Sequence, residues 1–143
     1  MNEIVTTAKV EETIALGRRV ALALTPPKIV LLRGDLGAGK TTLVKGVAEA
    51  FGAAAQDDVT SPTFTLVHEY RGSEATLYHI DLYRVDTDRE LETLGLDDLV
   101  VDPNGILLIE WGEKFERFRR DRDMEITLER LSEDERRITI SSP

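Results

Sequence analysis

Eight consecutive residues have the types and spacing of a phosphate-binding loop. They read Gly34-Asp35-Leu36-Gly37-Ala38-Gly39-Lys40-Thr41 and match the pattern G-x-x-x-x-G-K-[ST]. Glycines let the backbone curl so that successive N–H groups point at an anion where a helix begins. In that chemistry Lys40 reaches the β- and γ-phosphates and Thr41 offers its hydroxyl to Mg²⁺. The sequence therefore predicts that the chain binds a nucleoside triphosphate.

The residues on either side of this loop predict the strand and helix that such a loop joins. Residues 29–32 form a short apolar run, typical of a strand buried on both faces. Residues 42–51 have helical spacing and end near Gly52. A glycine-rich turn that merely connects two elements is the alternative, since the pattern is short. The placement between strand and helix favours the phosphate-binding interpretation.

Two acidic residues at strand ends are candidates for metal and water chemistry. Glu110 directly follows the apolar run 106–109, and a parallel strand beside the loop would deliver this carboxylate to a metal held by Thr41. An ordinary surface strand end is the other interpretation. Period-two alternation places Asp81 on the same strand face as His79. Asp81 is expected to position the attacking water, accept its proton or hold a magnesium-bound water, or else to cap the next turn.

Three further side chains each have one functional and one purely structural interpretation. His79 is more typical of a hydrogen-bonded strand histidine than of a catalytic one, and two histidines are too few for a histidine metal site. Thr63, in the turn Ser61-Pro62-Thr63, either senses the γ-phosphate or belongs to a simple strand entry. Trp111 is expected to pack in the protein rather than to stack on a base.

The pattern before and after the loop helix predicts a further helix and a hairpin. A helix over 10–24 stops at Thr25-Pro26-Pro27. Its apolar stripe comprises Leu16, Val20, Ala23 and Leu24. Strands over 64–70 and 75–81 form a β-hairpin around Arg71-Gly72-Ser73. One face of the first strand carries Phe64, Leu66, His68 and Tyr70.

The last elements complete an α/β fold. Alternating apolar residues over 124–128 and 138–140, with a polar turn between them, predict an antiparallel carboxyl-terminal hairpin. Parallel strands around the loop, joined to hairpins, give a three-layer sandwich of the P-loop NTPase type with a mixed parallel and antiparallel sheet. At 143 residues the chain is expected to be one domain, 1–143.

Composition and charge restrict the possible settings. The chain has no cysteine, no run of 18 apolar residues and no charged-then-apolar leader, so we expect no membrane and a cytoplasmic location. Its net charge of −9 opposes unaided binding to nucleic acid. Residues 86–102 carry seven acidic side chains and one basic side chain, Arg89. This acidic block is interpreted either as a solvated face or as a surface for a basic partner. Residues 113–123 are nearly all charged and are interpreted first as an exposed helix or loop and second as a contact patch.

With these pieces in place, nearly the whole chain resembles the TsaE family, formerly YjeE, the small ATPases of bacterial tRNA threonylcarbamoyladenosine modification. The resemblance rests on the loop 34–42, on Ser61-Pro62-Thr63-Phe64-Thr65-Leu66-Val67, His79-Ile80-Asp81-Leu82-Tyr83-Arg84, Glu92-Thr93-Leu94-Gly95-Leu96 and Ile109-Glu110-Trp111. Together these motifs are far more specific than the loop alone. Gly112 stands where many relatives have proline, and Thr25-Pro26-Pro27 fills a turn often built differently.

The resemblance implies cofactors, partners and residue roles. TsaE proteins associate with TsaB and TsaD, which transfer the threonylcarbamoyl group to tRNA, so tRNA contact would be indirect. ATP and Mg²⁺ are the implied cofactors, with Thr41 and Glu110 as metal ligands. Phosphate contacts fall on Gly37, Ala38, Gly39, Lys40, Thr41 and Thr42. Lys40, Thr63, Asp81 and Glu110 are the implied catalytic set, and Arg136 is a nucleotide contact suggested by the family's basic residue there.

Three functions fit the sequence. The leading hypothesis is a magnesium-dependent ATPase that is slow alone and activated by its partners. The sequence identifies no arginine finger within the chain, and Arg84 is the only nearby candidate for one. A small-molecule kinase would need an acceptor pocket and a lid, for which 143 residues leave scant room. A regulatory module that reads nucleotide state without useful turnover is the third possibility.

Overall fold

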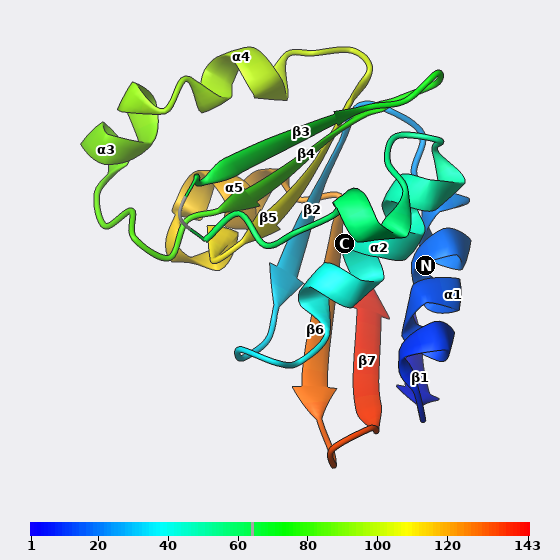
Figure 1. Ribbon diagram of the computed structural model, residues 1–143. Coiled ribbons are helices and arrows are strands. Elements are labelled where there is room, and N and C mark those ends of the chain that lie inside the picture. The colour runs from blue at the N-terminus through cyan, green and yellow to red at the C-terminus, as the bar shows by residue number, and fades with distance from the viewer. Residues whose placement is uncertain (64) are drawn as a thin grey trace.

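One mixed sheet crosses the computed structural model, which describes residues 1–63 and 65–143. Across those residues it has seven strands in the order β1-β7-β6-β2-β5-β4-β3 (Figure 1). They are β1 (Glu3–Thr7), β2 (Lys28–Arg33), β3 (Val67–Arg71), β4 (Thr76–Asp81), β5 (Gly105–Glu110), β6 (Met124–Arg130) and β7 (Arg136–Ser141). β2 runs parallel to β5 and β6, and β4 parallel to β5, whereas the other three pairs are antiparallel. The predicted mixed sheet with its two hairpins is confirmed.

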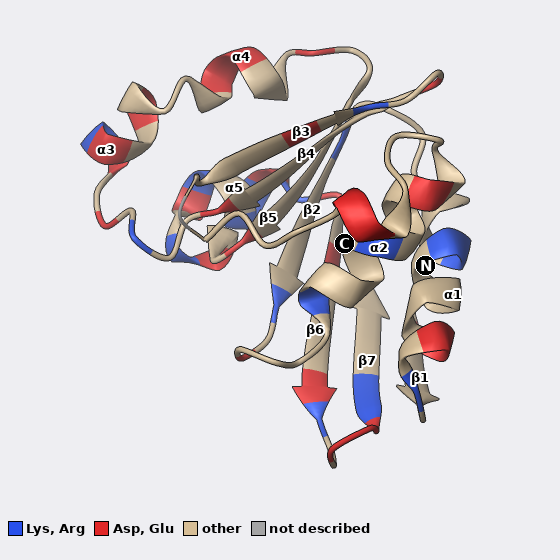
Figure 2. Cartoon of the chain, viewed as in Figure 1, with Lys and Arg blue, Asp and Glu red and all other residues tan. Residues whose placement is uncertain are grey.

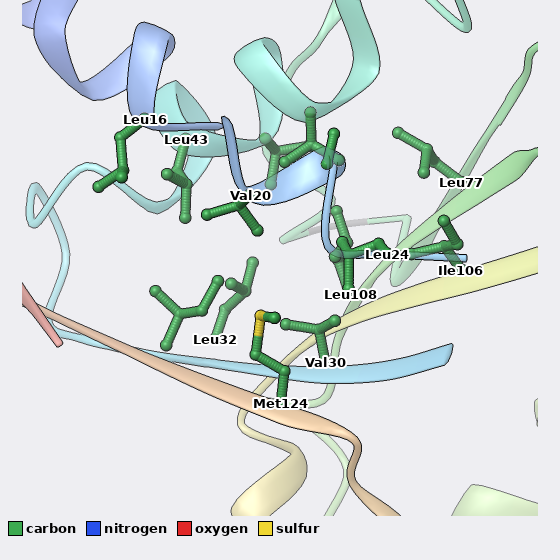
Figure 3. Packing of buried hydrophobic residues seen from close by; sticks show 14 of the residues in the cluster. Leu16, Val20, Leu24, Val30, Leu32, Leu43, Leu77, Ile106, Leu108 and Met124 are labelled. Carbon is green, nitrogen blue, oxygen red and sulfur yellow. The ribbon is translucent and has the colours of Figure 1, made fainter. Parts of the chain in front are cut away.

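Two helices cover one face of the sheet. α1 (Val10–Ala21) and α2 (Lys40–Ala50) lie side by side over it. Figure 3 shows their apolar side chains meeting those of the strands, with Leu16, Val20 and Leu43 above Val30, Leu32, Leu108 and Met124. α1 has 12 residues, and no helix within residues 1–63 or 65–143 has the length and apolarity to cross a bilayer.

Short helices cover the other face beside the parallel strands. They are α3 (Asp88–Thr93), α4 (Leu96–Val100), α5 (Glu116–Asp121) and the 3₁₀ turn η2 (Gly112–Lys114), while η1 (Gln56–Asp58) follows α2. Their buried side chains, such as Leu91, Leu96 and Phe118, pack on alternate residues of β2, β4 and β5. On the same face β6 and β7 carry polar, at least partly exposed residues: Thr127, Glu129, Arg137 and Thr139. The predicted sandwich is therefore three layers deep over β2, β5 and β4 and two layers deep over β6, β7 and β1.

Two element boundaries differ from the prediction. The first helix ends at Ala21 rather than Leu24, and Ala23 is exposed although Leu24 is buried. β3 begins at Val67 instead of 64, because Leu66 has a φ of 70°, which interrupts an extended strand. Phe64, predicted to share a face with Leu66, His68 and Tyr70, lies outside the described residues.

Other elements were not predicted at all. β1, α3 and α4 do not follow from any periodicity noted in the sequence. The acidic block 86–102 forms α3, α4 and their flanks, and Figure 2 shows acidic residues along both helices. Most of these residues are exposed, as expected of a solvated face. The charged segment 113–123 is only partly exposed, because Phe115 and Phe118 are buried. Two aromatic side chains therefore anchor a segment whose composition alone indicated a surface element.

α1 and α2 approach each other closely enough to require glycine at the contact. A Cβ on Gly46 would lie 2.0 Å from the carbonyl oxygen of Ile14, and one on Gly17 would lie 2.2 Å from that of Leu43. Both neighbours are backbone atoms, so the helices themselves would have to separate. This contact fixes α2, the helix that follows the phosphate loop, against the rest of the core.

We expect the substitution Gly46→Ala to lower the free energy of unfolding by about 1–3 kcal/mol through overpacking. This loss would occur although alanine in a helix interior is otherwise favoured over glycine by up to about 1 kcal/mol. Denaturant unfolding monitored by circular dichroism measures the difference. Ala50→Ser, which adds one atom at an exposed position of the same helix, is the control and should stay within about 0.5 kcal/mol of the parent. A Gly46→Ala protein as stable as the parent would contradict the close-contact interpretation.

Candidate nucleotide-binding site

The carboxyl ends of three parallel strands bring the predicted acids together. In the sheet register Leu32 of β2 lies opposite Glu110 of β5, and Glu110 lies opposite Asp81 of β4. The loop 34–39 leaves β2 at this same edge and leads into α2. Ligands of parallel α/β sheets bind outside the carboxyl ends of the strands. The fold thus places both acids beside the phosphate loop.

The loop has the backbone conformation for which its glycines are suited. Gly37 and Gly39 have φ values of 83° and 102°. A Cβ on Gly37 would meet nothing within 4 Å, so conformation rather than space demands glycine there. At Gly34 space matters too, since a Cβ would lie 2.7 Å from the carbonyl oxygen of Leu128. Gly39 is the N-cap of α2, and the first N–H groups of that helix lack intrahelical acceptors and suit an anion.

Lys40 connects the loop with the acid on the neighbouring strand. Its Nζ donates a short hydrogen bond to the carbonyl oxygen of Gly34 and lies 3.2 Å from Oε1 of Glu110. The Lys40 side chain is 11% exposed, and Glu110 is 4% exposed. Two charges buried to this extent require each other, because an unpaired charge in the interior is costly.

His79 holds the second oxygen of the same carboxylate. Its Nε2 lies 2.6 Å from Oε2 of Glu110, and the histidine is completely buried. Burial alone would raise the pKa of Glu110, but the hydrogen bond from His79 and the nearby ammonium of Lys40 lower this pKa below its usual value. Glu110 is therefore a carboxylate at neutral pH.

A cleft of about 530 Å³ opens over these groups. Its lining comprises Leu36, Gly37, Gly39, Lys40, Thr41, Thr42, Ser61, Thr63, Asp81, Tyr83, Glu110, Trp111 and Arg136. Every candidate site residue from the sequence except Ala38 thus lies around one cleft. Ala38 is buried and lines a neighbouring cleft on the other side of the loop.

Backbone hydrogen bonds tie the Thr63 turn to the strand ends. The Asp81 N–H donates to the carbonyl oxygen of Leu66, and the Leu66 N–H donates to that of Pro62. Within the turn, the hydroxyls of Ser61 and Thr63 are 2.7 Å apart. The turn is thereby held over the cleft, and its hydroxyls share the lining with Asp81.

Asp81 caps the turn after β4, as one interpretation of the sequence predicted, and it also lies in the cleft. Its Oδ1 accepts a hydrogen bond from the Tyr83 N–H at 2.9 Å and so caps the turn after β4. The residue is 5% exposed and still contributes to the cleft lining. The cap thus fixes the Asp81 carboxylate at the edge of the cleft.

Arg136, at the start of β7, reaches the same cleft from the carboxyl-terminal hairpin. Its guanidinium donates to the carbonyl oxygens of Ser132, Glu133 and Glu135. Its Nε would lie 3.9 Å from a Cβ on Gly39, next to the phosphate loop. The turn before β7 therefore holds this cation close to the loop.

Apolar side chains surround the mouth of the cleft. Leu36 is 99% exposed at the tip of the loop, and Tyr83 is 60% exposed. The ring of Tyr83 contacts that of Trp111 with a centroid distance of 5.3 Å. Trp111 has a φ of 64°, an uncommon conformation for a residue with a side chain. The expectation that Trp111 packs within the protein agrees with this contact, although its side chain also lines the cleft.

A second cleft, of about 700 Å³, adjoins the first across the loop. The two share Leu36, Lys40 and Trp111. Its far wall comprises Thr127, Leu128, Glu129 and Arg130 of β6. Space therefore exists beside Lys40 in addition to the first cleft.

The donor set of the first cleft fits magnesium bound together with phosphates. Thr41 offers a hydroxyl, and Glu110 and Asp81 offer carboxylates in the same lining. Among the described residues no three His, Cys, Asp or Glu side chains gather closely enough to hold a metal unaided. Mg²⁺ usually takes one or two protein carboxylates and completes its shell with phosphates and water, so this sparse set is suitable.

A phosphate loop between a buried strand and a helix, with a carboxylate at the end of the neighbouring parallel strand, defines a P-loop nucleotide-binding protein. The family model described as "Threonylcarbamoyl adenosine biosynthesis protein TsaE" matches residues 7–138. The chain belongs to the TsaE family, and membership implies that it binds a nucleotide.

Individual relatives agree with this assignment. The chain is 40% identical over 136 residues to TsaE of Bacillus subtilis, covering 95% of this chain and 83% of the relative. It is 41% identical over 132 residues to TsaE of Aquifex aeolicus, covering 91% of this chain and 89% of the relative. Among solved structures, YdiB of Bacillus subtilis superimposes with a TM-score of 0.72 at 34% identity, covering 99% of this chain and 87% of YdiB. These matches confirm the predicted fold class and family.

Sequence reasoning missed the contact between His79 and Glu110. Period-two alternation had placed His79 on the same face as Asp81, which was the available signal. The hydrogen bond depends on the register between β4 and β5, and register between residues 31 positions apart in the sequence is not readable from either strand alone.

We expect the stability difference between the parent and Glu110→Gln to depend on pH. Because the folded-state pKa of Glu110 is lowered, its carboxylate stabilises the fold above its unfolded pKa of about 4.3, and this contribution is lost as pH falls through the folded pKa. At pH 7 the variant should be about 1–3 kcal/mol less stable, and the gap should narrow below about pH 4.3. Urea unfolding from pH 7 to 3, without nucleotide or metal, measures the difference in free energy of unfolding. A difference that does not change with pH would contradict the lowered pKa of Glu110.

Proposed function

We propose that this protein is a magnesium-dependent ATPase that serves tRNA threonylcarbamoyladenosine biosynthesis together with TsaB and TsaD. The observation that carries the proposal is the contact of Lys40, in the phosphate loop, with Glu110, at the end of the adjacent parallel strand. Its relatives, which are TsaE proteins of tRNA threonylcarbamoyladenosine biosynthesis, supply the pathway. One sheet running through the chain supports a single ATPase domain, 1–143, and work on tRNA supports a cytoplasmic location.

The residues around the cleft would divide the work as follows. The N–H groups of 37–42 and the ammonium of Lys40 bind the phosphates, with Arg136 as a further nucleotide contact. Thr41 and Glu110 would hold Mg²⁺, which supplies charge neutralisation at the β- and γ-phosphates. Asp81 orients the attacking water or accepts its proton, and the Thr63 hydroxyl faces the terminal phosphate.

Dependence on partners follows from the charges in the cleft. Its only cations among the described residues are Lys40 and Arg136, and the latter is engaged by carbonyl oxygens of the preceding turn. An arginine supplied by a partner contributes roughly 10³–10⁵ in rate to related hydrolases. The isolated chain should therefore turn over slowly. The net charge of −9 supports indirect contact with tRNA through the partners.

A small-molecule kinase is the second candidate, and the cleft of about 700 Å³ beside Lys40 favours it. Its walls carry Arg33, Glu113, Glu129 and Arg130. Arg33 is paired with Glu113 and Glu125, which leaves this cation largely neutralised by its neighbours. Release of inorganic phosphate with no phosphorylated product, in a screen of hydroxyl and carboxylate acceptors, would exclude the kinase.

Nucleotide binding is tested by titrating the protein with ATP and Mg²⁺ in a calorimeter. We expect saturable binding, weakened roughly 10- to 100-fold in Lys40→Ala because a charge-assisted contact to phosphate is lost. Lys45→Ala, in the same helix but outside the cleft lining, should bind like the parent. Absence of heat with the folded parent protein would refute the proposed function.

Hydrolysis is tested by phosphate release with and without TsaB and TsaD. We expect slow turnover alone and clear stimulation by the pair. Glu110→Ala should reduce the stimulated rate by at least roughly 10²-fold, and the same variant should fail to complement a strain lacking its own TsaE. Full complementation by this hydrolysis-deficient variant would instead support the regulatory module. Rapid hydrolysis by the isolated chain would contradict partner activation.

A further inference from the structure

His79 is a buried polar residue without an evident packing purpose. It occupies a strand position between the buried apolar residues Leu77 and Ile80, and its side chain is completely excluded from solvent. Its Nδ1 has no hydrogen-bond partner among the described residues, and a buried, unpaired nitrogen destabilises a fold. An apolar side chain of similar size would fit a strand interior without that penalty. The presence of an imidazole therefore requires a reason other than core stability.

The geometry gives that reason through the other ring nitrogen. Nε2 lies 2.6 Å from Oε2 of Glu110, and no second polar contact of the ring occurs in the described residues. Since a carboxylate can only accept, Nε2 carries the proton and donates it. His79 thus directs its one polar contact at Glu110.

The two contacts on Glu110 come from different elements. Lys40 approaches Oε1 from the phosphate loop on a long, flexible side chain, whereas His79 approaches Oε2 from the neighbouring strand β4, where its ring is completely buried. Under the proposed function, Lys40 turns to the phosphates and Oε1 becomes available to the metal. His79 would then be the group that still holds the carboxylate in place.

We propose that His79 is a positioning residue that orients Glu110 for metal binding by donating its Nε2–H to Oε2 and leaving Oε1 to face the cleft. This inference rests on the proposed role of Glu110. Groups that hydrogen-bond a metal-ligating carboxylate typically contribute 10- to 100-fold to metal affinity. His79 acts through Glu110 and touches neither nucleotide nor metal.

The test compares His79→Leu with His79→Gln, whose amide nitrogen can replace Nε2 as a donor. We expect His79→Leu to bind Mn²⁺ in the presence of nucleotide roughly 10- to 100-fold more weakly, measured by electron paramagnetic resonance. Nucleotide affinity in EDTA should stay unchanged, whereas thermal stability should fall because the buried Glu110 carboxylate loses a hydrogen bond. His79→Gln should recover most of the Mn²⁺ affinity. The control is Tyr78→Phe, on the face of β4 opposite His79. It removes the hydroxyl that donates a hydrogen bond to Asp102 and should leave Mn²⁺ affinity unchanged.

The outcomes separate this inference from the proposed function. No nucleotide-dependent Mn²⁺ binding by the parent would refute the function itself. Normal Mn²⁺ affinity in His79→Leu, with the parent binding as expected, would refute only the positioning role. If His79→Leu does not fold, ¹⁵N-resolved spectra of the parent decide: a proton on Nε2 and a bare Nδ1 support the proposal, and the reverse tautomer overturns it.

Discussion

The site depends on one buried carboxylate and the two groups that hold it. Glu110 is almost fully buried at the end of β5, where an unpaired charge would be very unfavourable. His79 takes one oxygen and Lys40 the other. The ammonium that holds Glu110 also reaches the carbonyl oxygen of Gly34, so β4, β5 and the phosphate loop are connected by direct contacts through Glu110.

Parallel register makes this arrangement possible. β2, β5 and β4 end at the same level, so that residues from three distant parts of the chain, Leu32, Glu110 and Asp81, stand side by side. Alternation then decides which side chains face α2. Ile106 and Leu108 pack in the core shared with α2, and Glu110 continues that face at the point where the core opens into the cleft. A shift of one residue in either strand would turn Glu110 away from the loop.

The sequence predicted what is local or strongly patterned. The loop 34–41, the buried strand before it, both hairpins and the positions of Glu110 and Asp81 at strand ends all follow from short patterns, and the structure contains them. β1 was missed because it is a short edge strand, Glu-Ile-Val-Thr-Thr, that shows no polar and apolar alternation and pairs with β7 at the far end of the chain. α3 and α4 were missed because each is six residues or fewer and highly charged. The contact of His79 with Glu110 and the second cleft depend on tertiary placement, which no local pattern records.

The carboxyl-terminal hairpin shapes the phosphate loop. The backbone of β6 passes so close to Gly34 that a Cβ there would meet the carbonyl oxygen of Leu128 at 2.7 Å. A Cβ on Gly39 would face the Leu128 side chain at 3.6 Å and Arg136 at 3.9 Å. The loop is thus enclosed by β6 and β7 on one side and by the strand ends carrying Glu110 and Asp81 on the other. Glycine at position 34 therefore serves the packing of the hairpin as well as the loop, and the antiparallel half of the sheet is part of the site's support.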